Sequence, residues 1–121
     1  MTLLLIAIGA ALGAPARYLT DSAVQLRHET AFPWGTLTVN IIGSFILGLL
    51  TAASRWLDPA VAAGLAIGFC GGFTTYSTFG YETLRLAEDG ARFLAAANAI
   101  ASVVGGLGAV SLGLAVGAAF A

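Results

Sequence analysis

Four long apolar stretches, separated by short polar segments, constrain this chain more than any other feature. They run over about residues 1–19, 35–53, 60–86 and 93–120. A bilayer core is about 30 Å thick, and a helix needs about 20 mostly apolar residues to cross it. We therefore expect four membrane-spanning helices within a single transmembrane domain that covers residues 1–121.

The charge content supports a membrane protein and excludes several other classes. Only 9% of the 121 residues are charged, whereas a soluble domain averages roughly 25%. A net charge of −1 provides no basic face for nucleic acid. The single cysteine cannot form a disulfide framework or a multi-cysteine metal site. The first stretch lacks the basic leader of a signal peptide and three more spans follow, so we expect a retained helix.

The arginines give a small indication of orientation. Four spans place both termini on the same side of the membrane. Arg27, Arg85 and Arg92 lie in or beside the first and third loops, whereas Arg55 lies in the middle loop. The positive-inside rule then favours termini outside the cell. Because the difference is small, an orientation that is not fixed is an open alternative.

Glycines recur at four-residue spacing in three of the spans. They are Gly9 and Gly13, then Gly64, Gly68 and Gly72, then Gly113 and Gly117. Small residues let membrane helices approach closely where the hydrophobic effect no longer drives their association. The pattern therefore predicts helix packing. Four helices enclose little interior, so we expect any substrate path to form between two copies.

The third span contains an unusual segment, residues 71–80, with the sequence GGFTTYSTFG. Paired glycines followed by β-branched threonines form helix poorly, which predicts an interruption. Unwound backbone at membrane depth is tolerated only where it is buried in protein or lines a wet cavity. Its free carbonyls can hold a cation such as sodium. A simple kink filled by serine and threonine hydroxyls is the alternative.

An aromatic and acidic face follows the expected interruption. Tyr76 and Phe79 share a face if helix resumes, and ring edges carry positive potential that can meet a small anion. Core packing is the alternative for both rings. Glu82 continues the face near membrane depth, where an ionisable group is a functional candidate. Snorkelling or pairing with an arginine is the alternative for Glu82.

The other polar groups in the spans are few and rich in donors. Asn40 lies in the middle of the second span and Ser44 one turn later, while Asn98 and Ser102 share one stripe of the fourth. Each alone could join two helices, worth roughly 1 kcal/mol or less. Together they favour an anion path over a cation path. Arg17 needs a partner or a water-filled vestibule.

Two motifs resemble the CrcB/Fluc family of fluoride channels. They are GTLTVNIIGSF at residues 35–45 and GFCGGFTTYSTF at residues 68–79, and GAPARY at residues 13–18 is similar to the family's first-helix pattern. The resemblance covers nearly the whole chain. It implies an all-α membrane protein with four transmembrane helices per subunit and a broken third helix. It also implies an antiparallel, dual-topology dimer in the cell membrane.

The resemblance further implies a passive channel that exports fluoride from the cytoplasm and so reduces its toxicity. Two fluoride pathways would flank a structural sodium ion at the dimer centre. The ion would not be transported, and backbone carbonyls of Gly71 and Thr74 from each subunit would hold it. The dimer would form with a second copy of the chain, which we place first, or with a paralogous subunit.

Eight residues match the family's pathway positions. They are Arg17, Asn40, Tyr76, Ser77, Thr78, Phe79, Glu82 and Ser102. By this resemblance Asn40 would donate to fluoride, Phe79 would supply a ring edge, and Arg17 would line or close the vestibule. The remaining hydroxyl and carboxyl groups would form a polar wall. Tyr76 departs from the pattern, because the family usually has phenylalanine there.

Two other functions stay open at this point. Small proton-coupled multidrug exporters also use four short spans in antiparallel dimers, but they depend on a carboxylate in the first helix. Here that span holds only Arg17, so Glu82 would have to substitute from the third. A non-transporting assembly subunit is the remaining alternative.

Overall fold

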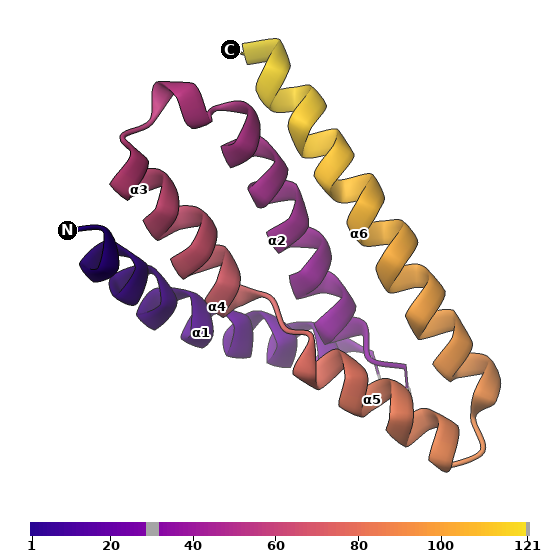
Figure 1. Ribbon diagram of the computed structural model, residues 1–121. Coiled ribbons are helices and arrows are strands. Elements are labelled where there is room, and N and C mark those ends of the chain that lie inside the picture. The colour runs from indigo at the N-terminus through magenta and orange to yellow at the C-terminus, as the bar shows by residue number, and fades with distance from the viewer. Residues whose placement is uncertain (29–31, 121) are drawn as a thin grey trace.

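The computed structural model describes residues 1–28 and 32–120, and all regular elements within them are helical (Figure 1). In chain order they are α1 (Thr2–Arg27), α2 (Trp34–Ala52), η1 (Ser54–Trp56), α3 (Pro59–Ala63), η2 (Gly64–Cys70), α4 (Gly71–Phe73), α5 (Ser77–Glu88) and α6 (Arg92–Phe120). Helices α3, η2 and α4 follow one another directly, and η2 has the wider π-helical turn.

Four helical spans among the described residues are long and apolar enough to cross a membrane, which confirms the predicted number. They cover Thr2–Arg27, Trp34–Ala52, Pro59–Glu88 and Arg92–Phe120. The first continues well past residue 19, where its apolar stretch ends. An apolar pattern marks where a chain leaves the hydrocarbon core. The helix itself continues through Thr20, Asp21 and Ser22 because no glycine or proline follows to stop it.

Helix α1 packs against η2 and α4 through glycines. A Cβ added to Gly9 would overlap the carbonyl oxygen of Gly64, and one added to Gly68 would lie 2.5 Å from the carbonyl oxygen of Ile6. These backbones therefore touch with no room for a side chain. The prediction that the spaced glycines serve helix packing is confirmed on this side of the bundle.

Helices α2 and α6 lie side by side along most of their lengths (Figure 1). Their backbones also approach closely at glycines. A Cβ on Gly48 would overlap the carbonyl oxygen of Val110, and one on Gly113 would overlap that of Phe45. The bundle thus contains two glycine-mediated helix pairs, α1 with η2 and α4, and α2 with α6.

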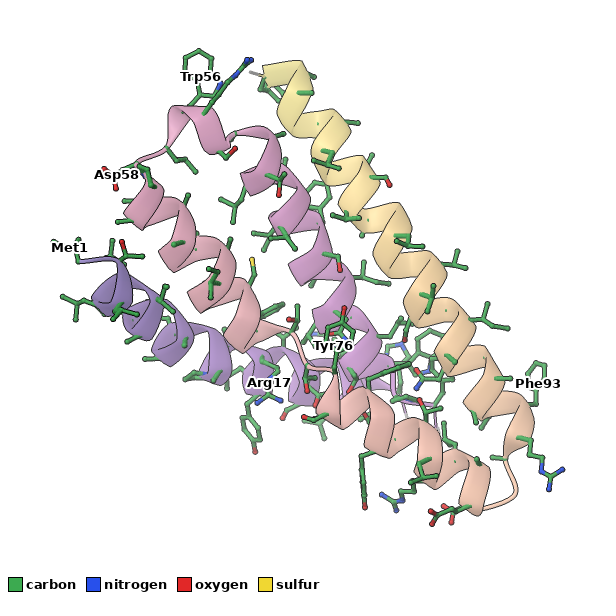
Figure 2. All side chains as sticks on the ribbon, in the orientation of Figure 1. Met1, Arg17, Trp56, Asp58, Tyr76 and Phe93 are labelled. Carbon is green, nitrogen blue, oxygen red and sulfur yellow. The ribbon has the colours of Figure 1, made fainter. Side chains whose placement is uncertain are left out.

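The interior is small and the outer surface is apolar. The largest fully buried side chains are Val39, Asn98 and Thr36, whereas Leu3 and Ile67 are among many large apolar side chains that are exposed. Figure 2 shows Trp56 and Phe93 at opposite ends of the bundle. Aromatic residues at both ends are typical of a protein that spans a bilayer.

Candidate functional site

Helical geometry stops between α4 and α5. Thr74 follows Phe73 in an extended conformation (φ −88°, ψ 163°), and α5 begins at Ser77. The backbone N–H and the hydroxyl of Thr74 both donate to the carbonyl of Cys70, at 2.9 and 2.8 Å. The side chain thus closes the end of α4, while the extended backbone turns the chain toward α5.

Asn40 of α2 holds the residue after this turn. Its Nδ2 donates to the carbonyl of Thr75 at 3.0 Å, and the N–H of Thr75 donates to its Oδ1 at 2.8 Å. One side chain therefore satisfies both backbone groups of an unwound residue within the third apolar span. Because an amide carries two N–H groups, this arrangement uses one donor of Asn40 and leaves it a second.

Two backbone donors near the turn are directed away from their usual helical acceptors. In a continuous helix the N–H of Thr75 would bond the carbonyl of Gly71, and the N–H of Thr78 would bond that of Thr74. Instead Thr75 donates to Asn40, and Thr78 donates to Thr75 Oγ1 at 3.2 Å. The carbonyl oxygens of Gly71 and Thr74 are therefore released from these two bonds.

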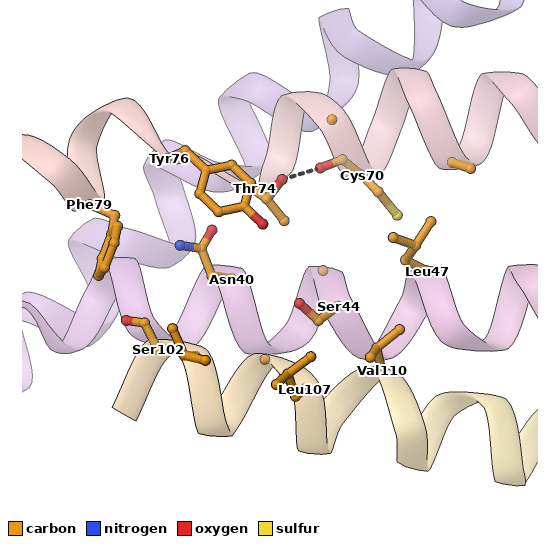
Figure 3. A pocket seen from close by; sticks show the side chains of 15 residues that line it. Asn40, Ser44, Leu47, Cys70, Thr74, Tyr76, Phe79, Ser102, Leu107 and Val110 are labelled. Carbon is orange, nitrogen blue, oxygen red and sulfur yellow. Dashed lines mark hydrogen bonds between the residues drawn. The ribbon is translucent and has the colours of Figure 1, made fainter. Parts of the chain in front are cut away.

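A pocket of about 470 Å³ lies between α2, α6 and the segment from η2 to α5 (Figure 3). Its polar lining comes from Asn40, Ser44, Thr74, Tyr76 and Ser102, and the ring of Phe79 closes one end. Figure 3 shows the Tyr76 ring beside Thr74 with its hydroxyl directed into the pocket. Tyr76 is 85% exposed, so this pocket opens widely on one side.

The pocket brings together six of the sequence-predicted residues. They are Asn40, Gly71, Thr74, Tyr76, Phe79 and Ser102. The oxygen of Ser102 is buried and has no hydrogen-bond partner among the described residues. Its O–H is thus a donor that a ligand or water would satisfy.

The other four predicted residues lie outside the pocket lining. Ser77 and Thr78 form the first turn of α5. Glu82 accepts a hydrogen bond from the hydroxyl of Thr36 on α2. Arg17 is half-buried on α1, and its Nε finds no hydrogen-bond partner in the described part of the chain.

Sequence reasoning missed the partners of these residues more than the residues themselves. Thr36, Asn40 and Ser44 stand four apart on α2, so a polar stripe was visible that could have identified Thr36. Thr75 and Thr83 carried no comparable signal. Their importance follows from Asn40 and Asn98, which lie opposite them on other helices.

The described residues contain no group of three or more His, Cys, Asp or Glu side chains that could hold a metal. Carbonyl oxygens at the end of α4 are the alternative type of ligand, since unwound backbone carbonyls at broken membrane helices can coordinate hard monovalent cations. The freed carbonyls of Gly71 and Thr74 suit that chemistry.

Comparison with known proteins gives consistent matches. Residues 4–114 match the family described as "CrcB-like protein, Camphor Resistance (CrcB)". The chain is 57% identical, over 95% of both chains, to "Fluoride-specific ion channel FluC 1" of Frankia casuarinae. It is 56% identical, over 94% of both, to the protein of that name from Streptomyces avermitilis. It is 50% identical to "Fluoride-specific ion channel FluC" of Geobacter sulfurreducens, over 84% of this chain and 85% of the other.

Proposed function

The chain belongs to the CrcB family, and we propose that it forms a fluoride-selective passive channel through which fluoride leaves the cytoplasm. Its four apolar spans and its relatives make it a multi-pass protein of the cell membrane and not an enzyme. One observation carries the proposal. A chain 57% identical to a named fluoride channel collects Asn40, Ser102 and Phe79 around one pocket.

The pocket lining suits a small, strongly hydrated anion. Fluoride must exchange its water for other donors, and the second N–H of Asn40 and the hydroxyl of Ser102 would supply them. The positive edge of the Phe79 ring adds a weaker attraction. Conduction also requires that each site release the ion readily, and neutral donors hold an anion less tightly than a full positive charge.

The driving force needs no energy-coupling machinery. Hydrogen fluoride crosses membranes as a neutral molecule and dissociates inside, which traps the anion. An inside-negative potential then pushes fluoride outward with roughly 2.3 kcal/mol per 100 mV. A passive channel is therefore sufficient for export and lowers the toxicity of fluoride.

A second protomer would complete the site. In this proposal an antiparallel partner, either a copy of the chain or a paralogous subunit, covers the open side of the pocket. The 85% exposure of Tyr76 supports this arrangement. A pocket with polar lining that faced lipid would leave its donors unsatisfied, at a cost of several kcal/mol for each group.

The carbonyls of Gly71 and Thr74 would hold a structural sodium ion between the two protomers. The diverted N–H groups of Thr75 and Thr78 support this assignment, because they free these two oxygens. When bound, the ion supplies positive charge near the anion path. Asn40 would keep the Gly71 carbonyl free by holding the Thr75 N–H, and the Thr75 hydroxyl would do the same for the Thr74 carbonyl by holding the Thr78 N–H.

Fluoride efflux from liposomes, followed with a fluoride electrode, tests the function. We expect the chain to release fluoride quickly when a potassium ionophore balances charge, and to leave chloride inside. Chloride efflux at a similar rate would contradict the proposal. Phe79→Ile should slow release, while Phe93→Ile, at an exposed position at the start of α6, should not.

Two further liposome experiments test the structural sodium ion and the identity of the partner subunit. Replacing sodium with a large organic cation during preparation should abolish fluoride release, and readdition should restore it. Liposomes that contain this chain alone distinguish the two kinds of partner. An inactive chain that becomes active with a sister subunit would favour the heterodimer. The relatives named above are fluoride channels and lend no support to a drug exporter, which would show drug-dependent proton movement instead.

A further inference from the structure

A relay of side-chain hydrogen bonds outside the pocket connects α6 to the first turn of α5. Asn98 Nδ2 donates to Thr83 Oγ1 at 2.8 Å, and Thr83 Oγ1 donates to the carbonyl of Phe79 at 2.8 Å. The Asn98 side chain is fully buried. Phe79 lines the pocket, so the relay starts in the protein interior and ends on a residue of the candidate pathway.

The relay acts on a helix with few apolar anchors. Leu86 is the buried residue of α5, and it lies near the far end of the helix from Phe79. Phe79 is the third residue of α5, close to the turn at residues 74–76, where helical hydrogen bonding is interrupted. The rotation of α5 about its axis sets where the Phe79 ring points, and apolar packing alone constrains that rotation weakly near the turn.

The hydroxyl of Thr83 has a defined direction because it is held from both sides. A threonine in a helix often donates to the carbonyl four residues earlier, and by itself such a bond is local and slightly destabilising. Here the same oxygen also accepts from a buried amide of another helix. The local bond thereby becomes a link between α6 and the backbone of Phe79.

We propose that Asn98 and Thr83 are positioning residues for Phe79. Asn98 fixes the Thr83 hydroxyl, and that hydroxyl fixes the first turn of α5 with the Phe79 ring at the pocket wall. Neither residue contacts the permeating ion in this proposal. The inference rests on the proposed function only where it assigns Phe79 to the fluoride path.

Matched variants separate positioning from a general loss of packing. Thr83→Val keeps the size and branching of the side chain and removes the hydroxyl, whereas Thr83→Ser keeps the hydroxyl. Thr51→Val is the control, because the Thr51 hydroxyl makes the same kind of bond, to the Leu47 carbonyl at 2.8 Å, on an exposed part of α2. Asn98→Ala removes the other end of the relay.

Fluoride efflux from liposomes is the first readout. We expect Thr83→Val and Asn98→Ala each to reduce fluoride flux roughly threefold, the scale of one interhelical hydrogen bond in a membrane. The double variant should be no worse than the poorer single variant, because both remove the same link. Thr83→Ser and Thr51→Val should conduct like wild type. Normal flux in Thr83→Val, or equal loss in Thr83→Ser, would overturn the proposal.

Hydrogen exchange of the backbone amides is the second readout and needs no fluoride conduction. In Thr83→Val the amides of α5 should exchange faster while those of α2 stay unchanged. Unchanged exchange in α5, or the same increase in every helix, would overturn the positioning role. If the wild-type chain released no fluoride, the proposed function would fail while exchange still decided this inference. If Asn98→Ala did not accumulate, the nearly isosteric Thr83→Val would decide it.

Discussion

The two halves of the third span are held in place by different kinds of contact. The half formed by η2 and α4 packs backbone against backbone on α1, with Gly68 and Gly72 at the contact. The half formed by α5 instead uses side-chain hydrogen bonds, from Thr36 of α2 to Glu82 and from Asn98 of α6 to Thr83. Asn40 joins the region between them to α2.

This difference separates a rigid platform from an adjustable wall. Close-packed backbones tolerate almost no displacement, because any added volume meets main-chain atoms. Hydrogen bonds between side chains fix direction while leaving room around them, and each is worth only about 1 kcal/mol between membrane helices. We therefore expect the α1 side to carry the stability of the bundle and the α5 side to set the geometry of the pocket.

The largest expected effect comes from filling the glycine contact. In Gly68→Val a Cβ would lie 2.5 Å from the Ile6 carbonyl oxygen, and neither backbone can withdraw. Overpacking typically costs about 1–3 kcal/mol, and we expect the upper end of that range here because both atoms in the contact belong to main chain. Size-exclusion chromatography in detergent after a heat step should show loss of the folded protein.

Gly108→Val is the matched control for this substitution, because a Cβ there meets nothing within 4 Å. It introduces the same side chain into a helix of the same membrane protein. Equal losses in the two variants would show that valine in the helix, and not the contact with α1, causes the instability.

A smaller but still large effect is expected at the turn. Asn40→Ala leaves the N–H and the carbonyl of Thr75 without their partner, at a cost of about 1–3 kcal/mol for an unsatisfied buried group. Both thermal stability and fluoride flux should fall. Ser44→Ala, one turn along the same pocket, should change thermal stability little, and an equal loss there would contradict the role assigned to Asn40.

The hydrogen bond from Thr36 of α2 to Glu82 of α5 should contribute less to the stability of the protein. Thr36→Val removes the hydroxyl that donates to Glu82 and should lower stability by about 1 kcal/mol. Amide exchange should rise in α5 and stay unchanged in η2 and α4. The control is Thr38→Val, because the Thr38 hydroxyl donates to the Trp34 carbonyl within the same helix. This variant should leave amide exchange in α5 unchanged. Faster amide exchange of α5 in both variants would argue against a specific role for the bond between Thr36 and Glu82.

The smallest expected effect is an increase in stability. Gly80 lies within α5, and a Cβ there meets nothing within 4 Å. Replacing an interior helical glycine by alanine stabilises a helix by about 1 kcal/mol, so Gly80→Ala should raise the melting temperature slightly. The same change at Gly9, where a Cβ would overlap the Gly64 carbonyl, should lower it. Equal shifts would contradict the contrast between the two halves.

Much of the candidate site was visible in the sequence as residue types, and little of it as contacts. Asn40, Phe79 and Ser102 stood out as polar or aromatic groups in apolar spans, and the structure gathers them around one pocket. Their bonds were not visible. Asn40 was expected to donate to the ion, and its amide also holds the Thr75 backbone. That pairing depends on which turn of α2 faces residues 74–76.

The sequence by itself determined that the chain has four membrane spans, because the length of an apolar stretch and its low charge content are local properties that decide whether it can cross a bilayer. It also placed glycines where helices approach closely. Only the tertiary structure decided that Glu82 meets Thr36 and that Asn98 meets Thr83. Such pairs depend on the rotation and crossing angle of whole helices. Close packing at distant glycines sets these angles, and no local sequence pattern encodes them.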